Sequence, residues 1–317
     1  MYYIGLMNPL SSLSRSFSGK RLVVVLSLFT TICFCLSFLL TPVFRRAIPG
    51  GVADSIGYVL LTFSFSPGMY PVIRFISLFL CLLLLIGAVQ MVKGGGNGQL
   101  VSFVAAVLLF DHLVGLLSLV SGDLTNMLQF SPRYWIKYLI GAAWIRYAGG
   151  FVWCAIAVLL LKETQRHRGL AIREVLSESG DLAGEYVHGA RGVRFLNLLI
   201  DMVVCCTYFL LAGRIWSMLL FQRATELLGE RNAVILYFVL FRVSYYLFFE
   251  TVYQATPGKF LTGTRVADFY GQKIVFSQAL SRTFSRMVPF EPFSFLGKGD
   301  GWHDRWSQTY VLKEGKG

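Results

Sequence analysis

The sequence predicts an all-α polytopic membrane protein with six transmembrane helices and a small cytosolic C-terminal cap of short strands plus an amphipathic helix. Three observations support this fold class. Of the 317 residues, 55% are hydrophobic and 15% are charged, whereas soluble domains carry about 25% charged residues. The mean hydropathy is +0.61. The apolar stretches are long and continuous, which favours helices over the short alternating segments of a membrane barrel.

Six apolar stretches are long enough, or nearly long enough, to cross the hydrocarbon layer as helices. They are Leu22–Leu40, Val72–Val92, Leu100–Val120, Ile140–Leu161, Phe195–Ile215 and Ala233–Phe249. The first stretch is longer than the apolar part of a usual signal peptide, and no small-x-small cleavage site follows it, so we expect a permanent helix. A glycine-rich turn, Lys93 to Gly98, makes the second and third stretches antiparallel neighbours.

The composition divides the chain into three regions. Residues 1–161 form a four-helix transmembrane region, and residues 162–191 form a charged cytosolic connector with no apolar run. Residues 192–317 hold two transmembrane helices and a tail. In that tail we expect two short strands around a turn near Tyr270, an amphipathic helix at Ser277–Met287 that lies on the inner leaflet, and a strand at Thr309–Leu312. Arg282 and Arg286 would form the basic edge of that helix.

Basic residues predict the orientation. With the N-terminus inside, the cytosolic segments contain 19 of the 29 Lys and Arg residues. We therefore expect a multi-pass protein of the bacterial cytoplasmic (inner) membrane with both termini cytosolic. The net charge of +12 follows mostly from this bias and favours contact with anionic inner-leaflet lipids. Nucleic-acid binding is not favoured, because no basic stripe with aromatic residues stands apart from the membrane.

Several motifs in order resemble the RDD family of membrane proteins, which is named for an arginine and two aspartates. They are "ARGVRFLNLLIDMVV", "TPGKFLTGTRVADFYGQKIVFSQALSRTFSR" and "HDRWSQTYVL". The similarity covers about residues 192–312, and "PFEPFSFLG" resembles a Bacteroidetes-type variant of the family. The resemblance assigns the motif to Arg194, Asp201 and, in the tail segment His303-Asp304-Arg305, to Asp304. It implies transport of an unidentified ligand, with monovalent cation/proton exchange attributed to some members. The N-terminal part resembles no family.

Charged side chains inside the apolar stretches are the candidate ion- or proton-binding residues. Arg194, Asn197 and Asp201 share one face of the fifth span, because their spacing is i, i+3, i+7. An aspartate in hydrocarbon costs on the order of 2.5–3.5 kcal/mol on insertion scales and therefore needs a partner. Matching depths in an antiparallel helix pair predict that Asp201 pairs with Arg242 of the sixth span, and Arg194 with Glu250.

A second buried acid–base pair is expected between the third and fourth spans. Asp111 and His112 lie near the middle of the third span, and Arg146 lies at a similar depth in the fourth. Each pair has a structural interpretation as well, since buried charge pairs can fix the register of helices without moving an ion. His112 has the same alternative, as a hydrogen-bonded interior histidine.

Three functions remain open on the sequence. The first is a transporter that moves a small ion or solute through a buried Asp/Arg site. The second is a membrane scaffold or accessory subunit whose cap binds a partner protein or a second copy of the chain. The third is an enzyme acting on a lipid-like substrate, which is weakest because His303 and Asp304 have no companion nucleophile. No nucleotide, metal or hydrolase motif is present, so we expect no cofactor, no metal and no enzymatic activity.

The basic-residue bias makes a direct prediction about topology. A cysteine introduced at Gly180, in the charged connector, should react with a membrane-impermeant thiol reagent only after the membrane is permeabilised. Labelling of intact cells at this position would place the connector outside and reverse the predicted orientation.

Overall fold

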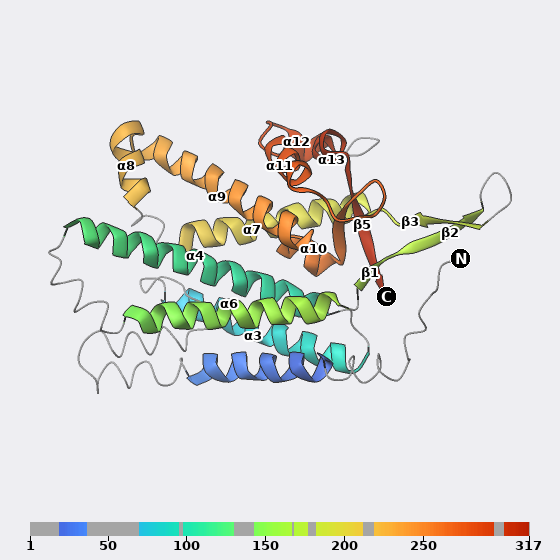
Figure 1. The fold of residues 1–317 in the computed structure, drawn as a ribbon, viewed down its shortest axis with the longest axis horizontal. Helices are drawn as coiled ribbons and strands as arrows, with labels where there is room; N and C mark the ends of the chain where they lie inside the picture. The colour runs from blue at the N-terminus through green and yellow to red at the C-terminus, as the bar shows by residue number, and fades with distance from the viewer. Residues whose placement is uncertain are drawn as a thin grey trace, which may run out of the picture.

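The computed structural model describes residues 19–36, 70–94, 98–129, 143–166, 168–176, 182–211, 219–294 and 301–316. Long helices lie side by side in a bundle, with a small sheet at one end of it (Figure 1). The labelled helices of the bundle are α3 (Tyr70–Val92), α4 (Gln99–Gln129), α6 (Ala143–Gln165), α7 (Arg191–Leu211), α8 (Leu219–Leu228) and α9 (Glu230–Tyr253).

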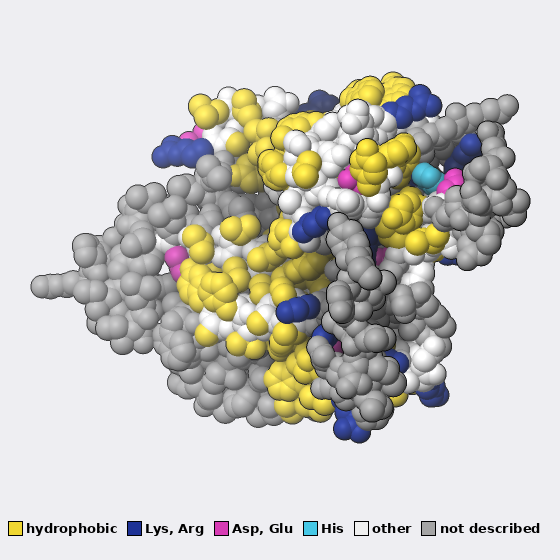
Figure 2. Space-filling view, turned by 45° about the vertical axis from the view of Figure 1, so that its right-hand side comes forward, with side chains coloured by type: hydrophobic (Ala, Val, Ile, Leu, Met, Phe, Trp, Pro, Cys, Tyr) yellow, Lys and Arg dark blue, Asp and Glu magenta, His cyan; other side chains and the backbone are white. Residues whose placement is uncertain are grey.

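Six described helices are long and apolar enough to cross a membrane, and each overlaps one of the six predicted spans. They are Gly19–Leu36, Phe75–Val92, Gln99–Val120, Tyr147–Gln165, Arg191–Phe209 and Glu230–Tyr253. α4 is the most enclosed, with 78% of its span buried, against 22% for α9. Exposed leucine, valine and phenylalanine side chains on the outer helices give the bundle a broad hydrophobic surface, part of which is visible in Figure 2. Such a surface suits contact with hydrocarbon.

α3 and α4 pack against each other, which confirms that these two helices are neighbours. In the turn between them, Gly94 and Gly98 have φ of 72° and 67°, a left-handed conformation that only glycine adopts without strain. This turn, the end of α6, the start of α7 and the end of α9 all lie at the same end of the bundle as the sheet (Figure 1). The helices therefore alternate in direction as the sequence predicts.

The expected connector contains strands that the sequence analysis did not anticipate. β1 (Arg168–Leu170) pairs with β5 (Thr309–Lys316), which pairs in turn with β4 (Thr264–Asp268), in the antiparallel order β1-β5-β4. β2 (Ile172–Leu176) and β3 (Leu182–Tyr186) form a separate hairpin. Because β1 is hydrogen-bonded to the last strand of the chain, the connector is part of the C-terminal sheet.

The tail agrees only in part with its prediction. The predicted strand at Thr309–Leu312 is confirmed as the start of β5, and β4 is the first of the two strands expected around Tyr270. The second is wrong: the chain after Tyr270 forms a turn, in which the Asp268 carboxylate accepts hydrogen bonds from the backbone of Tyr270 and Gln272 at 2.9 and 2.7 Å. The remaining tail elements are α10 (Pro257–Thr262), α11 (Phe276–Ser285), α12 (Glu291–Ser294) and α13 (Trp302–Ser307).

One hydrophobic core spans the N-terminal and C-terminal regions. The ring of Phe110 in α4 lies 5.3 Å from that of Tyr208 in α7 and 5.0 Å from that of Tyr245 in α9. The Tyr208 hydroxyl donates to the Val107 carbonyl of α4 at 3.2 Å. At the sheet end, Arg168 contacts Glu314 at 2.8 Å and Ser102 of α4 at 3.0 Å. The first helices therefore support the two helices and the tail that follow them.

Candidate functional site

Glu250, near the end of α9, is fully buried and is held by three cationic side chains. Its carboxylate lies 2.8 Å from Lys259 Nζ of α10 and 3.2 Å from Arg282 Nε of α11. Arg286, just after α11, adds contacts of 2.8 and 3.1 Å. A buried carboxylate is stable only when its charge and lone pairs are satisfied. Glu250 therefore fixes α10 and α11 against α9.

Asp201, in the middle of α7, is 1% exposed and is bound by neutral donors. Tyr245 Oη and the Gly258 backbone N–H donate to Oδ1 at 2.8 Å each, and Thr256 Oγ1 donates to Oδ2 at 2.6 Å. Thr256 is the N-cap residue of α10, but its side chain accepts no hydrogen bond from the backbone N–H groups of that helix. The Asp201 carboxylate takes that place, because the first turn of a helix leaves N–H groups unpaired and attracts negative charge.

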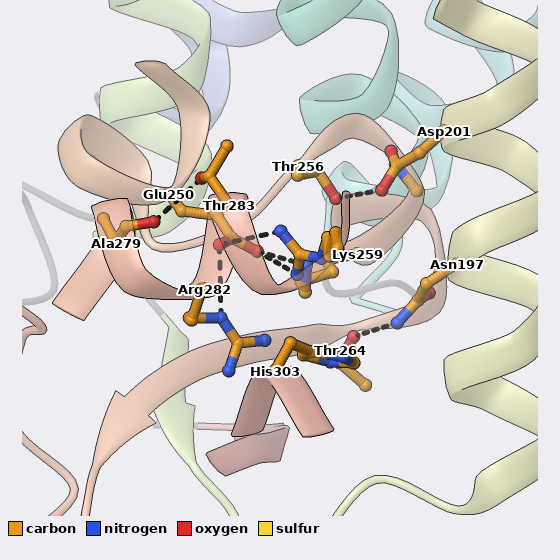
Figure 3. Close-up of polar contacts among 12 residues, drawn as sticks. Asn197, Asp201, Glu250, Thr256, Lys259, Thr264, Ala279, Arg282, Thr283 and His303 are labelled. Atoms are coloured by element: carbon orange, nitrogen blue, oxygen red, sulfur yellow. Dashed lines mark hydrogen bonds and ion pairs between the residues drawn. The ribbon is translucent and has the colours of Figure 1, made fainter. Parts of the chain in front are cut away.

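Gly258 makes this contact between α7 and α10 sterically feasible. A Cβ at this position would lie 2.6 Å from the Asn197 carbonyl oxygen and 2.9 Å from Asp201 Oδ1. Both are contacts that a real Cβ essentially never makes. Asn197 adds a second link, since its Nδ2 donates to Thr264 Oγ1 of β4 at 3.0 Å and its Oδ1 accepts from Thr262. Figure 3 shows Lys259 between the Asp201 and Glu250 carboxylates.

Asp304 of α13 is the second acid that joins the tail to the helices. It pairs with Arg194 of α7 at 2.9 Å and with Arg282, which also contacts Thr309. Burial alone would raise the pKa of the Asp304 carboxyl, but Arg282, His303 and Arg194 lower that pKa below its ordinary value. Two residues of the family motif, Arg194 and Asp304, therefore form a buried ion pair.

His303 links the cluster to α12. Its Nδ1 contacts Glu291, and its Nε2 lies 3.5 Å from Asp304. Burial lowers the pKa of His303, although Asp304 and Glu291 oppose that shift. Burial also lowers the pKa of Lys259, which Glu250 opposes. An imidazole with a lowered pKa is neutral near pH 7 and donates one ring N–H to a neighbouring carboxylate.

These side chains form the buried polar cluster, which borders a partly open cavity of about 40 Å³. The cluster comprises Arg194, Asn197, Asp201, Glu250, Lys259, Arg282, Arg286, Glu291, His303 and Asp304. Four of its members are cations and four are carboxylic acids, so the cluster is close to electrically neutral. Most of them line the cavity, together with Leu198, Tyr246 and Val311. A cavity of this size has room for about three water molecules or one small ion.

The predicted pairs Asp201–Arg242 and Arg194–Glu250 are wrong. In the described structure Asp201 contacts Tyr245, Thr256 and Gly258, and Arg194 contacts Asp304. Arg242 is partly buried, lies 5.8 Å from the Tyr246 ring centre and has a buried Nε without a hydrogen-bond partner in the described part. The physical reason is α10, which packs against α7 and α4 and brings its own N-terminus and Lys259 to the two acids.

The helix predicted at Ser277–Met287 is confirmed as α11, but its basic edge does not face the membrane. Arg282 is fully buried and Arg286 is 7% exposed, because both bind Glu250. The outward face of α11 instead exposes Phe276 and Phe284, at 56% and 57%. Contact of this face with the inner leaflet stays a prediction.

The remaining predicted residues lie outside the buried polar cluster. Asp111 and His112 are 3% and 1% exposed within α4, and the His112 ring stacks on Trp153 of α6 at 6.0 Å. The side chain of Arg146 is outside the described residues, so the Asp111–Arg146 pair stays a prediction. Arg305 is exposed and lines a surface groove with Phe269, Tyr270 and Tyr310.

Sequence reasoning did not assign five residues to the site: Thr256, the N-cap of α10, Gly258 and Lys259 of α10, and Arg282 and Arg286 in and after α11. The signal for the first three was the segment Thr-Pro-Gly-Lys directly after the sixth span, which has the pattern of a helix start. The signal for the arginines was Glu250 itself, since a buried carboxylate requires cations near it. Glu291 was missed as well, and no spacing rule connects it to His303.

Comparison with known proteins agrees with the resemblance found in the sequence. Residues 189–308 match the RDD family, which confirms the expected family for the C-terminal part of the chain, and the N-terminal part matches no family. No curated protein and no solved structure matches the chain. The match includes Arg194, Asp201 and Asp304, all three of which lie in the buried polar cluster.

The close approach at Gly258 predicts a specific loss of stability. Gly258→Ala should lower the free energy of unfolding by roughly 1–3 kcal/mol, because α10 must move away from α7 to make room for the methyl group. Gly192→Ala is the matched control, since a Cβ there meets nothing within 4 Å. Thermal unfolding of the purified variants checks the difference. Equal melting temperatures would show that α10 does not pack on α7 at Gly258.

Proposed function

We propose that this chain, whose C-terminal part is of the RDD family, is a multi-pass membrane protein that exchanges protons against a small monovalent ion, with Asp201 as the group that takes up and releases the proton. The observation that carries the proposal is the chemistry around this carboxylate. Among the described residues, Asp201 makes hydrogen bonds to neutral donors and no ion pair. Glu250 and Asp304 each contact arginines, which remain charged at any accessible pH and keep their partners ionised.

The donors around Asp201 suit a group that changes protonation state. Two of the three are hydroxyl groups, those of Tyr245 and Thr256. A hydroxyl donates a hydrogen bond to a carboxylate and accepts one from a carboxylic acid. Thr256 can therefore reverse its role when Asp201 binds a proton, and neither oxygen of Asp201 is left unpaired. Buried polar groups that retain partners in both states avoid most of the cost of the change.

On the face of α7 that carries Asp201, polar side chains continue for part of the way across the bundle. Cys205 and Tyr208 follow at the spacing of one helix face, and both are buried. Beyond them the ring of Phe209 of α7 packs against Phe238 and Phe241 of α9, at centroid distances of 5.1 and 6.3 Å. A path that ends at packed aromatic rings fits a site that is open to one side at a time. Separation of α10 from α7 is the movement that would uncover Asp201.

A scaffold role is the second candidate, and exposed aromatic residues on the cap favour it. Phe269, Tyr270 and Phe290 are 69%, 72% and 75% exposed. Phe269 and Tyr270 lie beside Arg305 in a groove of about 380 Å³. Aromatic residues and arginine are the residues most enriched at protein interfaces. In a scaffold, the buried polar cluster would only hold the cap on the membrane helices.

A flux assay separates the two functions. The purified chain is reconstituted in liposomes, and a pH gradient is imposed across the membrane. The gradient should dissipate when Na⁺, K⁺ or Cl⁻ is supplied on the side opposite the higher proton concentration. Asp201→Asn should reduce that flux at least tenfold, because the amide cannot carry the proton. Glu226→Gln is the matched control, since Glu226 is an exposed acid on α8 whose side chain is 61% accessible.

Thermal unfolding of Asp201→Asn completes the assay, because the amide retains the shape of the acid and should still cap α10. A folded Asp201→Asn variant with the flux of the wild type would refute the proposal. Absence of gradient-driven flux in the wild type with all three ions would favour the scaffold.

A further inference from the structure

The guanidinium group of Arg282 has one nitrogen that its surroundings do not satisfy. Arg282 is fully buried, its Nε and NH1 bind Glu250, Asp304 and Thr309, and its NH2 is buried with no hydrogen-bond partner in the described structure. Buried charged donors without a partner are rare, since each costs more than a neutral one. The same side chain lines the cavity of about 40 Å³.

The wall of that cavity carries more positive than negative charge. Four cationic side chains line it: Arg194, Lys259, Arg282 and Arg286. Two acids, Asp201 and Glu291, lie on the same wall, whereas Glu250 and Asp304 are not among the lining residues. His303, also on the wall, has a pKa lowered by burial and adds no full charge near pH 7. Glu250 and Asp304 neutralise these cations from behind the wall, so the groups that face the cavity are mostly cationic although the cluster as a whole is close to neutral, and this arrangement favours an anion over a metal cation.

The size of the cavity limits the anion. A volume of about 40 Å³ corresponds to about three water-sized probes, which admits a halide and excludes an anion as large as gluconate. Arg282 NH2 and the Asn197 amide on the same wall are N–H groups, which are the donors that halides accept from. Leu198 and Val311 supply the apolar remainder of the lining.

We propose that the cavity of the buried polar cluster is a binding site for a chloride-sized monovalent anion, held by Arg282 NH2 and the surrounding cations. The site stands on the geometry of the cavity and does not require transport. The anion is a bound ligand and not the ion that is exchanged for the proton, since exchange requires alternate binding, but it shares one wall with Asp201. A proton on Asp201 removes a negative charge that repels the anion, so the two ligands favour each other's binding.

The test uses the full chain in lipid nanodiscs of constant composition. The melting temperature is measured as sodium chloride or sodium bromide replaces sodium gluconate at fixed ionic strength. A ligand that binds the folded state raises the melting temperature in a saturable way. We expect saturation with chloride and bromide but not with gluconate, which is too large for the cavity. Equal stability in all three salts would mean that water alone fills the cavity and would overturn the proposal.

Two variants assign the effect to this cavity. Asp201→Asn removes a negative charge from the wall and should lower the chloride concentration at half-saturation by roughly tenfold or more, because repulsion between two like charges across one small cavity is lost. Arg282→Lys keeps the charge but removes NH2 and should abolish the saturable response, with Arg305→Lys as its control, because the Arg305 side chain of α13 is exposed. If the chloride concentration at half-saturation is the same in Asp201→Asn as in the wild type, the proposal is overturned, even if Arg282→Lys fails to fold. Loss of flux by Asp201→Asn together with an unchanged chloride midpoint would leave the proton exchange standing and refute the anion site.

Discussion

The carboxylate of Glu250 is the constraint on which the rest of the C-terminal structure depends. It lies fully buried near the end of α9, and Lys259, Arg282 and Arg286 reach it from α10 and from α11 and the residue after it. Each contact orients a different element. Lys259 holds α10 where its N-terminus meets Asp201, and Arg282 extends from Glu250 to Asp304, which in turn binds Arg194 of α7. One buried negative charge thus fixes the cap, the fifth helix and the sixth helix relative to one another.

The sequence predicted the membrane helices well because hydrophobic length is a local property. All six predicted spans overlap helices of sufficient length and hydropathy, and the turn at Gly94 and Gly98 has the left-handed glycines that a tight connection needs. The elements that failed depend on distant residues. β1 exists because it pairs with β5, a distant strand at the other end of the chain, with Leu170 opposite Glu314. The polar composition of residues 162–191 gave no sign of that partner.

The candidate site was predicted as a set of residues but not as a set of contacts. Asp201, Arg194, Asn197 and Glu250 were all singled out by charge within an apolar helix, and all four lie in the buried polar cluster. Their partners were predicted from matching depths in the membrane of two antiparallel helices, a prediction that did not include α10. The short helix enters between α7 and α4 because Gly258 has no side chain, and steric access of this kind is not visible in periodicity or charge. The contacts divide the acids into two kinds: Glu250 and Asp304 hold the architecture through arginines, whereas Asp201 is bound by neutral donors, which is the basis for proposing it as the group that binds the proton.

Hydrogen exchange on Glu250→Gln tests the central role of this carboxylate most directly. Removal of one charge should leave three cations without their shared partner, at a cost of roughly 3–5 kcal/mol. Amide exchange should therefore accelerate through α10 and α11, while α4 and α6 keep the protection of the wild type. Glu226→Gln, which removes an exposed acid from α8, should leave all of these rates unchanged. Unaltered exchange of α10 and α11 in Glu250→Gln would contradict the account, because it would show that other contacts hold the cap to the membrane helices.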